Sequence, residues 1–75
     1  MWNTMIGRLH IVAASKGGKV EYWAAATSRE NAEALVQKLV PPGWKAVLTD
    51  RRITPEHARA LRLLPDGAEK LKYVP

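Results

Sequence analysis

The chain has 75 residues, a formal net charge of +5 and no cysteine. A chain of this length forms one domain at most and buries only about 60% of its unfolded surface, so its core is small. The lack of cysteine excludes disulfides, thiolate catalysis and cysteine-based zinc sites, and it favours a reducing compartment.

Residues 7–26 predict a β-hairpin. Residues 7–14 alternate with a period of two, as a strand does, and residues 20–26 open with β-forming side chains. Between them, Gly17 and Gly18 favour a two-residue type I′ turn, because both central positions of that turn need positive φ. The register that follows pairs Lys16 with Lys19, Ala14 with Glu21, Val12 with Trp23, and His10 with Ala25.

The alternation also divides the hairpin into two faces. One face collects most of the apolar side chains, and we interpret it as the core face: Leu9, Ile11, Ala13, Val20, Tyr22 and Ala24. The other face carries Trp23 among polar and basic side chains: Arg8, His10, Lys16, Lys19 and Glu21. We therefore expect Trp23 to lie on an open face of the sheet.

A helix and a third strand follow the hairpin. Thr27 is the expected helix cap, with Glu30 reaching back to it, and Ser28 is the competing cap. The helical apolar stripe consists of Ala32, Leu35, Val36, Leu39 and Val40. Pro41, Pro42 and Gly43 end the helix, since proline lacks the backbone donor. Residues 44–50 then predict a strand whose core side is Trp44, Ala46 and Leu48, with Lys45, Val47 and Thr49 on the other side.

A second helix begins near Thr54. Thr54 is its expected cap, Pro55 its first residue, and its inner stripe is Ala58, Leu61 and Leu64. Residues 68–75 fit a short edge strand, a last helical turn or a frayed tail.

The element order ββαβα predicts one α+β domain over residues 1–75, with residues 1–6 and 74–75 frayed. The crossover through the first helix places the third strand parallel to the second and antiparallel to the first. The expected architecture is a two-layer sandwich with a mainly antiparallel three-stranded sheet of order 3-1-2, two helices and a possible short C-terminal strand.

Two groups of residues are candidates for ligand binding. Trp23 and its basic neighbours resemble the stacking platforms of single-strand binders, in which bases stack on a ring and cations follow the backbone. This group consists of Trp23, Arg8, His10, Lys16, Lys19 and Lys45. A second basic group surrounds the second helix and consists of Arg51, Arg52, Arg59 and Arg62. The structural alternatives are that Trp23 is core covered by the second helix or a partner subunit, and that the cations are ordinary solvated surface.

Other kinds of site find little support in the sequence. His10 and His57 are the chain's two histidines and lack metal-ligand spacing, so no metal site is expected. The carboxylates are scattered, and no nucleophile–base pair can be identified from the spacing. We expect no catalytic residues, no enzymatic activity and no small-molecule cofactor.

Residues 24–35, AAATSRENAEAL, and residues 42–48, PGWKAVL, resemble the strand–helix–strand half of the SPOR peptidoglycan-binding domains. That family combines two such halves and acts in the periplasm. In this chain the segment before the resemblance predicts a hairpin instead.

The sequence therefore predicts a small non-catalytic binding module in the cytoplasm, without a signal peptide or membrane helix. The net positive charge is compatible with nucleic acid as the partner. The leading hypothesis is nucleic-acid binding through the Trp23 face. The alternative is a protein-interaction or homodimerisation module that buries the same face, and a third reading is an accessory piece of an enzyme.

Overall fold

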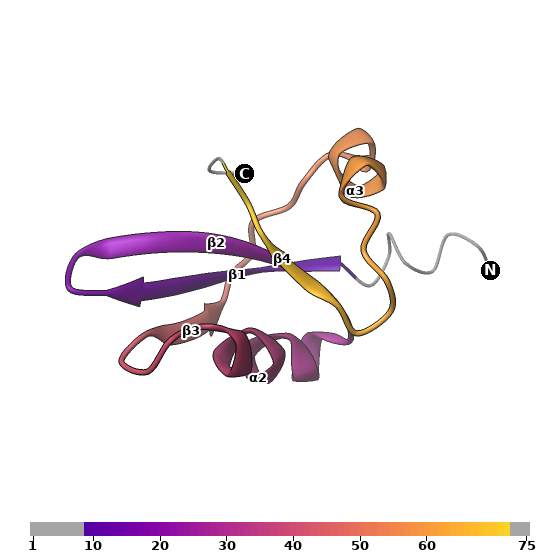
Figure 1. The fold of residues 1–75 in the computed structure, drawn as a ribbon. Helices are drawn as coiled ribbons and strands as arrows, with labels where there is room; N and C mark the ends of the chain where they lie inside the picture. The colour runs from indigo at the N-terminus through magenta and orange to yellow at the C-terminus, as the bar shows by residue number, and fades with distance from the viewer. Residues whose placement is uncertain (1–8, 73–75) are drawn as a thin grey trace.

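The computed structural model describes residues 9–72, which form an α+β sandwich, as the element order predicts. Figure 1 shows the elements in chain order: β1 (Leu9–Lys16), β2 (Lys19–Ala26), α2 (Arg29–Leu39), β3 (Lys45–Leu48), α3 (Pro55–Leu61) and β4 (Ala68–Lys70). The expected fraying of residues 1–6 and 74–75, and the position of Arg8, lie outside the described residues. Within residues 9–72, no helix has the length and apolar character needed to cross a membrane.

The hairpin has the predicted turn and register. β1 and β2 pair antiparallel, with Lys16 opposite Lys19 and Val12 opposite Trp23. Gly17 and Gly18 have φ values of 55° and 85°. These left-handed values suit a type I′ turn, and glycine adopts them without steric cost. The glycine pair therefore fixes which residues of the two strands face each other.

The sheet contains the predicted order and one further strand. Its strands lie in the order β3-β1-β2-β4, and all neighbours are antiparallel. The predicted 3-1-2 arrangement is confirmed, with Ala46 of β3 opposite Ala14 of β1. Of the three alternatives for the C-terminal segment, the edge strand is correct for Ala68–Lys70, which pairs with β2.

Helix α2 covers the face of the hairpin that was expected to be open. Val12 and Ala14 are fully buried in a cluster that also contains Ala32 and Val36 of α2, and Trp23 packs against this cluster. The expectation that Trp23 lies on an open face is therefore wrong, whereas Ile11 and Ala24 of the predicted core face are buried as expected. The period-two pattern cannot separate the faces because both are apolar, whereas the crossover from β2 through α2 to β3 places the helix on one side only. Alanines on the sheet and on α2 allow the two layers to approach closely.

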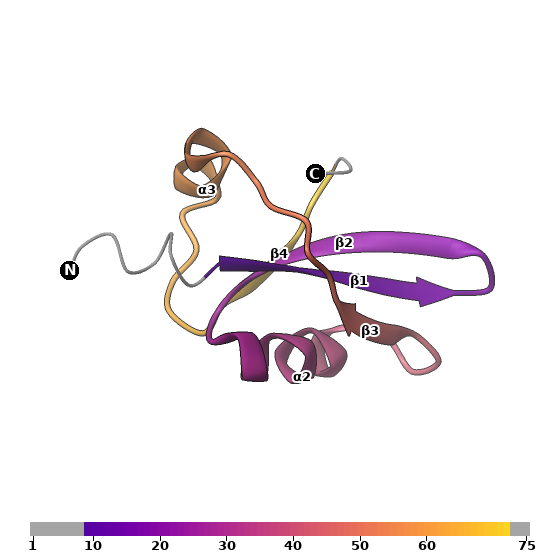
Figure 2. The ribbon, with the colours of Figure 1, turned by 180° about the vertical axis from the view of Figure 1, so that it is seen from behind.

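The opposite face carries a second, smaller cluster. Ile11, Ala24 and Leu71 are buried there. Five partly buried side chains pack against them: Leu9, Tyr22, Ile53, Leu61 and Leu63. Figures 1 and 2 show α3 on this side, beyond the start of β1 and far from the hairpin turn. Near the turn, no helix of the described chain covers this face, and Val20, an expected core residue, is 53% exposed.

The start of α2 differs from the predicted capping box. Ser28, the competing cap, precedes the helix, and its side chain makes no cap hydrogen bond. Thr27 instead donates its hydroxyl to Oδ1 of Asp66 at 3.0 Å. Because Thr27 is buried, its hydroxyl needs an internal acceptor, and Asp66 supplies one from the turn before β4. The threonine therefore ties two distant turns together instead of capping the helix.

Two polar side chains of α2 bind the edge of β3. Glu33 accepts a hydrogen bond from the backbone N–H of Leu48 at 2.9 Å. Gln37 accepts from the N–H of Ala46 at 2.9 Å and donates to the carbonyl of Trp44 at 2.7 Å. Both side chains are exposed, and they satisfy backbone groups along an otherwise unpaired strand edge.

Helix α3 begins as predicted and ends early. Thr54 precedes Pro55 and accepts a hydrogen bond from the N–H of His57 at 3.2 Å. The helix ends at Leu61, followed by Arg62 in a left-handed conformation with φ 52°. Leu64 therefore lies beyond the helix and is 76% exposed, so its predicted place in the inner stripe is wrong. No residue of α3 is fully buried.

Candidate functional site

Trp23, the leading candidate from the sequence, contacts the protein's own core. Its ring packs against the cluster beneath α2, and its indole Nε1 is buried without a hydrogen-bond partner. Trp23 is therefore a partly buried side chain of the α2 face and does not lie on an open face of the sheet. The alternative that Trp23 packs in the core therefore fits the structure better than an open face does. The helix packed on this face is α2, however, and not the second predicted helix.

Three other candidates, His10, Arg51 and Arg52, line one pocket with a volume of about 430 Å³. The pocket lies where the start of β1, the start of α2 and residues 49–53 come together. We term it the arginine pocket, and its lining is Leu9, His10, Arg29, Thr49, Asp50, Arg51, Arg52, Ile53 and Ala58. Its volume falls within the range of about 300–1,000 Å³ that is usual for small-ligand sites.

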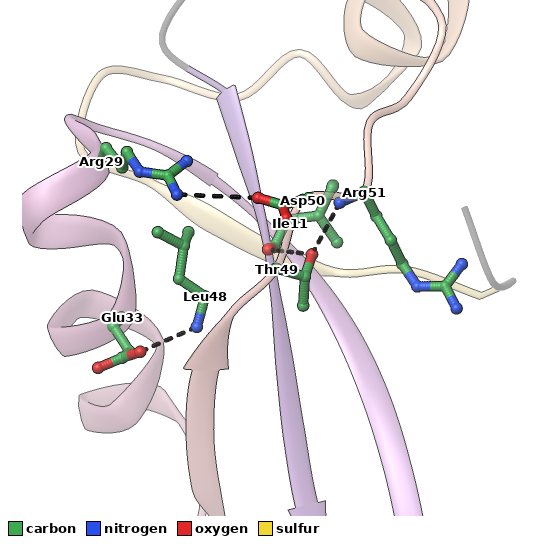
Figure 3. Close-up of polar contacts among 7 residues, drawn as sticks. All are labelled: Ile11, Arg29, Glu33, Leu48, Thr49, Asp50 and Arg51. Atoms are coloured by element: carbon green, nitrogen blue, oxygen red, sulfur yellow. Dashed lines mark hydrogen bonds and ion pairs between the residues drawn. The ribbon is translucent and has the colours of Figure 1, made fainter.

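Thr49 fixes the path of the chain along the pocket. Its N–H and its hydroxyl both donate to the carbonyl oxygen of Ile11, at 3.0 Å and 2.8 Å. The same hydroxyl accepts from the N–H of Arg51 at 3.2 Å. Figure 3 shows these bonds holding residues 49–51 across the edge of β1. Because the hydroxyl already donates one hydrogen bond and accepts another, it acts as an anchor for the segment that carries Arg51.

Arg29 and Asp50 approach each other on the α2 side of the pocket. Arg29 Nη2 lies 3.8 Å from Asp50 Oδ1, and their side chains are 63% and 98% exposed. Burial, together with the nearby positive charge of Arg29, lowers the pKa of His10 below its ordinary value of 6.5. His10 therefore carries less positive charge at pH 7 than an ordinary histidine, and the arginines of the lining supply the positive charge of the pocket.

Arg51 connects the arginine pocket to the uncovered part of the sheet. Its guanidinium carbon lies 4.9 Å from the centre of the Tyr22 ring, a distance typical of a cation–π contact. In Figure 3 the side chains of Arg29 and Arg51 lie on opposite sides of residues 49–50, with Arg29 directed toward Asp50. Arg51 therefore lies over the face of the sheet opposite α2.

The exposed surface around Tyr22 comes from three strands. The pairing places Ala13 opposite both Tyr22 and Val47, and Ser15 opposite both Val20 and Lys45. Val20 and Val47 are 53% and 45% exposed, and Lys45 is also exposed. We term this surface the tyrosine face and define it as Ala13, Ser15, Val20, Tyr22, Lys45 and Val47. With Arg51 it combines apolar area, one aromatic ring and two cations.

The remaining candidates are dispersed. Lys16 and Lys19 flank the hairpin turn and are exposed, and the end of the Lys16 side chain lies beside Gly43. Arg59 and Arg62 are exposed on α3 and at its end, and neither lines the arginine pocket. The structure therefore brings together His10, Arg51 and Arg52, places Lys45 on the tyrosine face, and leaves the others apart.

Sequence reasoning missed Arg29 and Tyr22. Arg29 has the spacing of an intrahelical pair with Glu33, but Glu33 binds the backbone of β3 and Arg29 lies near Asp50. Tyr22 was assigned to the core face. The signal that could have identified Tyr22 is the strand register. It places Tyr22 on the same face of the sheet as Ser15, Lys45 and Val47, and that face is partly polar near the hairpin turn.

The described residues offer no metal centre, since no group of three His, Asp or Glu side chains within residues 9–72 could hold an ion. No protein-family model matches the chain, and no curated protein or solved structure is significantly similar to it. The function therefore has to be inferred from the geometry of the arginine pocket and the tyrosine face.

Proposed function

We propose that this domain is a non-catalytic module that binds single-stranded nucleic acid across the tyrosine face and the arginine pocket. The observation that carries the proposal is the position of Arg51, which lies over the Tyr22 ring and also lines the pocket. A single-stranded nucleic acid bound along Arg51 would run from the tyrosine face, where its bases can stack, to the arginine pocket, where cations can bind its phosphates.

The chemistry of the two surfaces matches the two parts of a nucleotide. Aromatic rings and guanidinium planes both stack on unpaired bases, and Tyr22 with Arg51 offers such a stack. Val20 and Val47 add exposed apolar area beside it. Arg29 and Arg52 in the pocket and Lys45 on the sheet provide charges for phosphate. An α-helix reading duplex DNA fits less well, because α3 is a single helix of seven residues.

The experiment is a fluorescence anisotropy titration with a single-stranded 12-mer and the matching duplex, at low salt and then at rising salt. Neutralised phosphates release counterions, so the logarithm of the association constant should fall linearly with the logarithm of the salt concentration. With three or four phosphate contacts on a single strand, the expected slope is about −2 to −3. The single strand should bind more tightly than the duplex.

Arg51→Gln and Lys38→Gln make a matched pair for this titration. Both remove one positive charge from an exposed side chain, but Lys38 lies near the C-terminal end of α2 and lines neither surface. Arg51→Gln should weaken binding at least about fivefold, whereas Lys38→Gln should change it less than twofold. If neither oligonucleotide binds at low salt, the proposal is wrong.

A second candidate function is self-association through the tyrosine face. The exposed valines favour it, because Val20 and Val47 lie on one side of the sheet without a covering helix in the described chain. Under this alternative, sedimentation equilibrium at rising protein concentration would give a dimer that Val47→Lys disrupts. A monomer at all concentrations would exclude the alternative.

A further inference from the structure

The arginine pocket differs from the tyrosine face in having two chemically distinct sides. Leu9 and Ile53 both pack with the apolar cluster on the α3 side of the sheet, and Ala58 of α3 joins them in the lining. On the α2 side lie His10 and the side chain of Arg29, the first residue of α2. The pocket thus spans the edge of β1, from an apolar side to a cationic side.

The charges of the lining favour a dianion. The lining residues include three arginines and one aspartate, a formal charge of +2 with His10 left out, and the guanidinium of Arg51 lies over the Tyr22 ring. A phosphomonoester carries about −1.5 to −2 at this pH, because its second pKa is near 6. An internal phosphodiester of a strand carries only −1. A terminal phosphate therefore complements the pocket better than an internal one does.

The Arg29–Asp50 ion pair is weak, so Arg29 can bind such an anion instead. At 3.8 Å, with both side chains mostly exposed, the pair contributes little to stability. Arg29 can turn to a phosphate oxygen at little cost, and a guanidinium group can bind phosphate through two parallel hydrogen bonds. The Asp50 carboxylate can then accept a hydrogen bond from a sugar hydroxyl or a base amino group.

We infer that the arginine pocket binds a phosphorylated terminal nucleotide, with the phosphate toward Arg29 and Arg52 and the sugar or base against Leu9, Ile53 and Ala58. The inference rests on the proposed function in taking a nucleic-acid strand as the source of this nucleotide. A free nucleoside monophosphate has the same chemistry, so the experiment separates the two sources.

The test compares three single-stranded 8-mers labelled internally, so that both ends are free. One carries a 5′-phosphate, one a 3′-phosphate, and one has hydroxyl groups at both ends. At low salt, at least one phosphorylated strand should bind about fivefold or more tightly than the hydroxyl strand. Free nucleoside monophosphates are titrated in parallel, with the amide NMR signals of residues 49–53 and Ala58 as the readout.

Two variants localise the effect. Arg52→Gln removes a charge from the lining, and Ala58→Leu fills space on the apolar side. Each should abolish the advantage of the phosphorylated strand, so that within each variant the affinities of the phosphorylated and hydroxyl strands differ less than twofold. Lys38→Gln is the charge-matched control and should retain the advantage. Circular dichroism confirms that each variant is folded.

The outcomes separate the two proposals. If all three strands bind equally, the inference about the pocket is overturned and nucleic-acid binding stands. If no strand binds but a free nucleoside monophosphate shifts the pocket signals, nucleic-acid binding is overturned and the pocket is a site for free nucleotides. If neither strands nor free nucleotides bind, both proposals are overturned.

Discussion

The two faces of the sheet are built differently although the sequence gives them similar apolar content. Under α2, Val12, Ala14 and Val36 have no measurable exposure, and the helix lies along the strands. On the other face, α3 contributes no fully buried residue, and the sheet near the hairpin turn remains open. Stability is therefore concentrated under α2, and the exposed chemistry lies on the opposite face and at the edge of β1.

This difference shows that one face can be fixed by packing while the other remains available for binding. Tyr22 and Trp23 make the contrast within two adjacent residues. Trp23 points toward α2 and loses its contact with solvent at Nε1, whereas Tyr22 lies on the face that Arg51 overlies. Four experiments test this contrast, from the largest expected effect to the smallest.

A charge placed beneath α2 should prevent folding. Val36→Asp puts a carboxylate where exposure is 0%. A buried charge without a partner costs several kcal/mol, and a domain of this size has a total stability of only about 4–11 kcal/mol. The variant should lose its cooperative urea unfolding transition, followed by circular dichroism. Leu39→Asp changes a residue of the same helix that is 49% exposed, and this variant should keep the unfolding transition. If both variants lost the transition, the difference between the buried and exposed sides of α2 would be contradicted.

The pair Trp23→Leu and Tyr22→Leu should separate stability from binding. Trp23→Leu should lower the free energy of unfolding by about 2 kcal/mol, because it leaves unfilled volume under α2. Its affinity for single-stranded nucleic acid should stay within twofold.

Tyr22→Leu should do the reverse. The loss of stability should be about 1 kcal/mol, since Tyr22 is partly exposed and leucine keeps part of its apolar contact. Affinity should fall at least about fivefold, as stacking on an aromatic side chain is worth about 1–3 kcal/mol per base. Urea unfolding and anisotropy titrations measure the two quantities, and weaker binding by the Trp23 variant alone would reverse the assignment of the faces.

The helix caps offer a smaller comparison between the two sides. Thr54→Ala removes the hydroxyl that accepts from the His57 N–H, so stability should fall by about 1 kcal/mol. Ser28→Ala at the start of α2 should have almost no effect, because the Ser28 side chain makes no cap bond. Urea unfolding of the two variants checks this. Equal losses of stability in the two variants would contradict the difference between a capping Thr54 and a non-capping Ser28.

The smallest expected effect is the pH dependence of stability at the pocket. Folding lowers the pKa of His10, so below pH 6.5 the unfolded chain binds a proton more readily than the folded chain does. Stability should therefore decrease as the pH falls through this window towards the lower pKa of the folded state. The charged groups around His10 in the pocket are Arg29, Arg51, Arg52 and Asp50.

His10→Gln should flatten this decrease between pH 7.5 and 5.5, as measured by urea unfolding at a series of pH values. An unchanged slope in the variant would mean that other groups cause the acid sensitivity.

The sequence by itself determined the local geometry of this protein. Gly17 and Gly18 set the turn and, through it, every pair between β1 and β2, because glycine adopts both left-handed values without steric cost. The length of the β2–α2–β3 connection and the handedness rule gave the strand order. Thr54 and Pro55 likewise identified the start of α3 from short-range hydrogen bonding. Such features depend on residues close together in the chain.

Only the tertiary structure decided which face is covered and which cations meet. Both hairpin faces are apolar, so the period of two could not show that α2 lies over Val12 and not over Ile11. The arginine pocket joins His10, Arg29 and Arg52, which come from three separate segments, and its formation depends on how residues 49–53 cross β1. Contacts of this kind arise from long-range packing, and neither local propensity nor spacing encodes them.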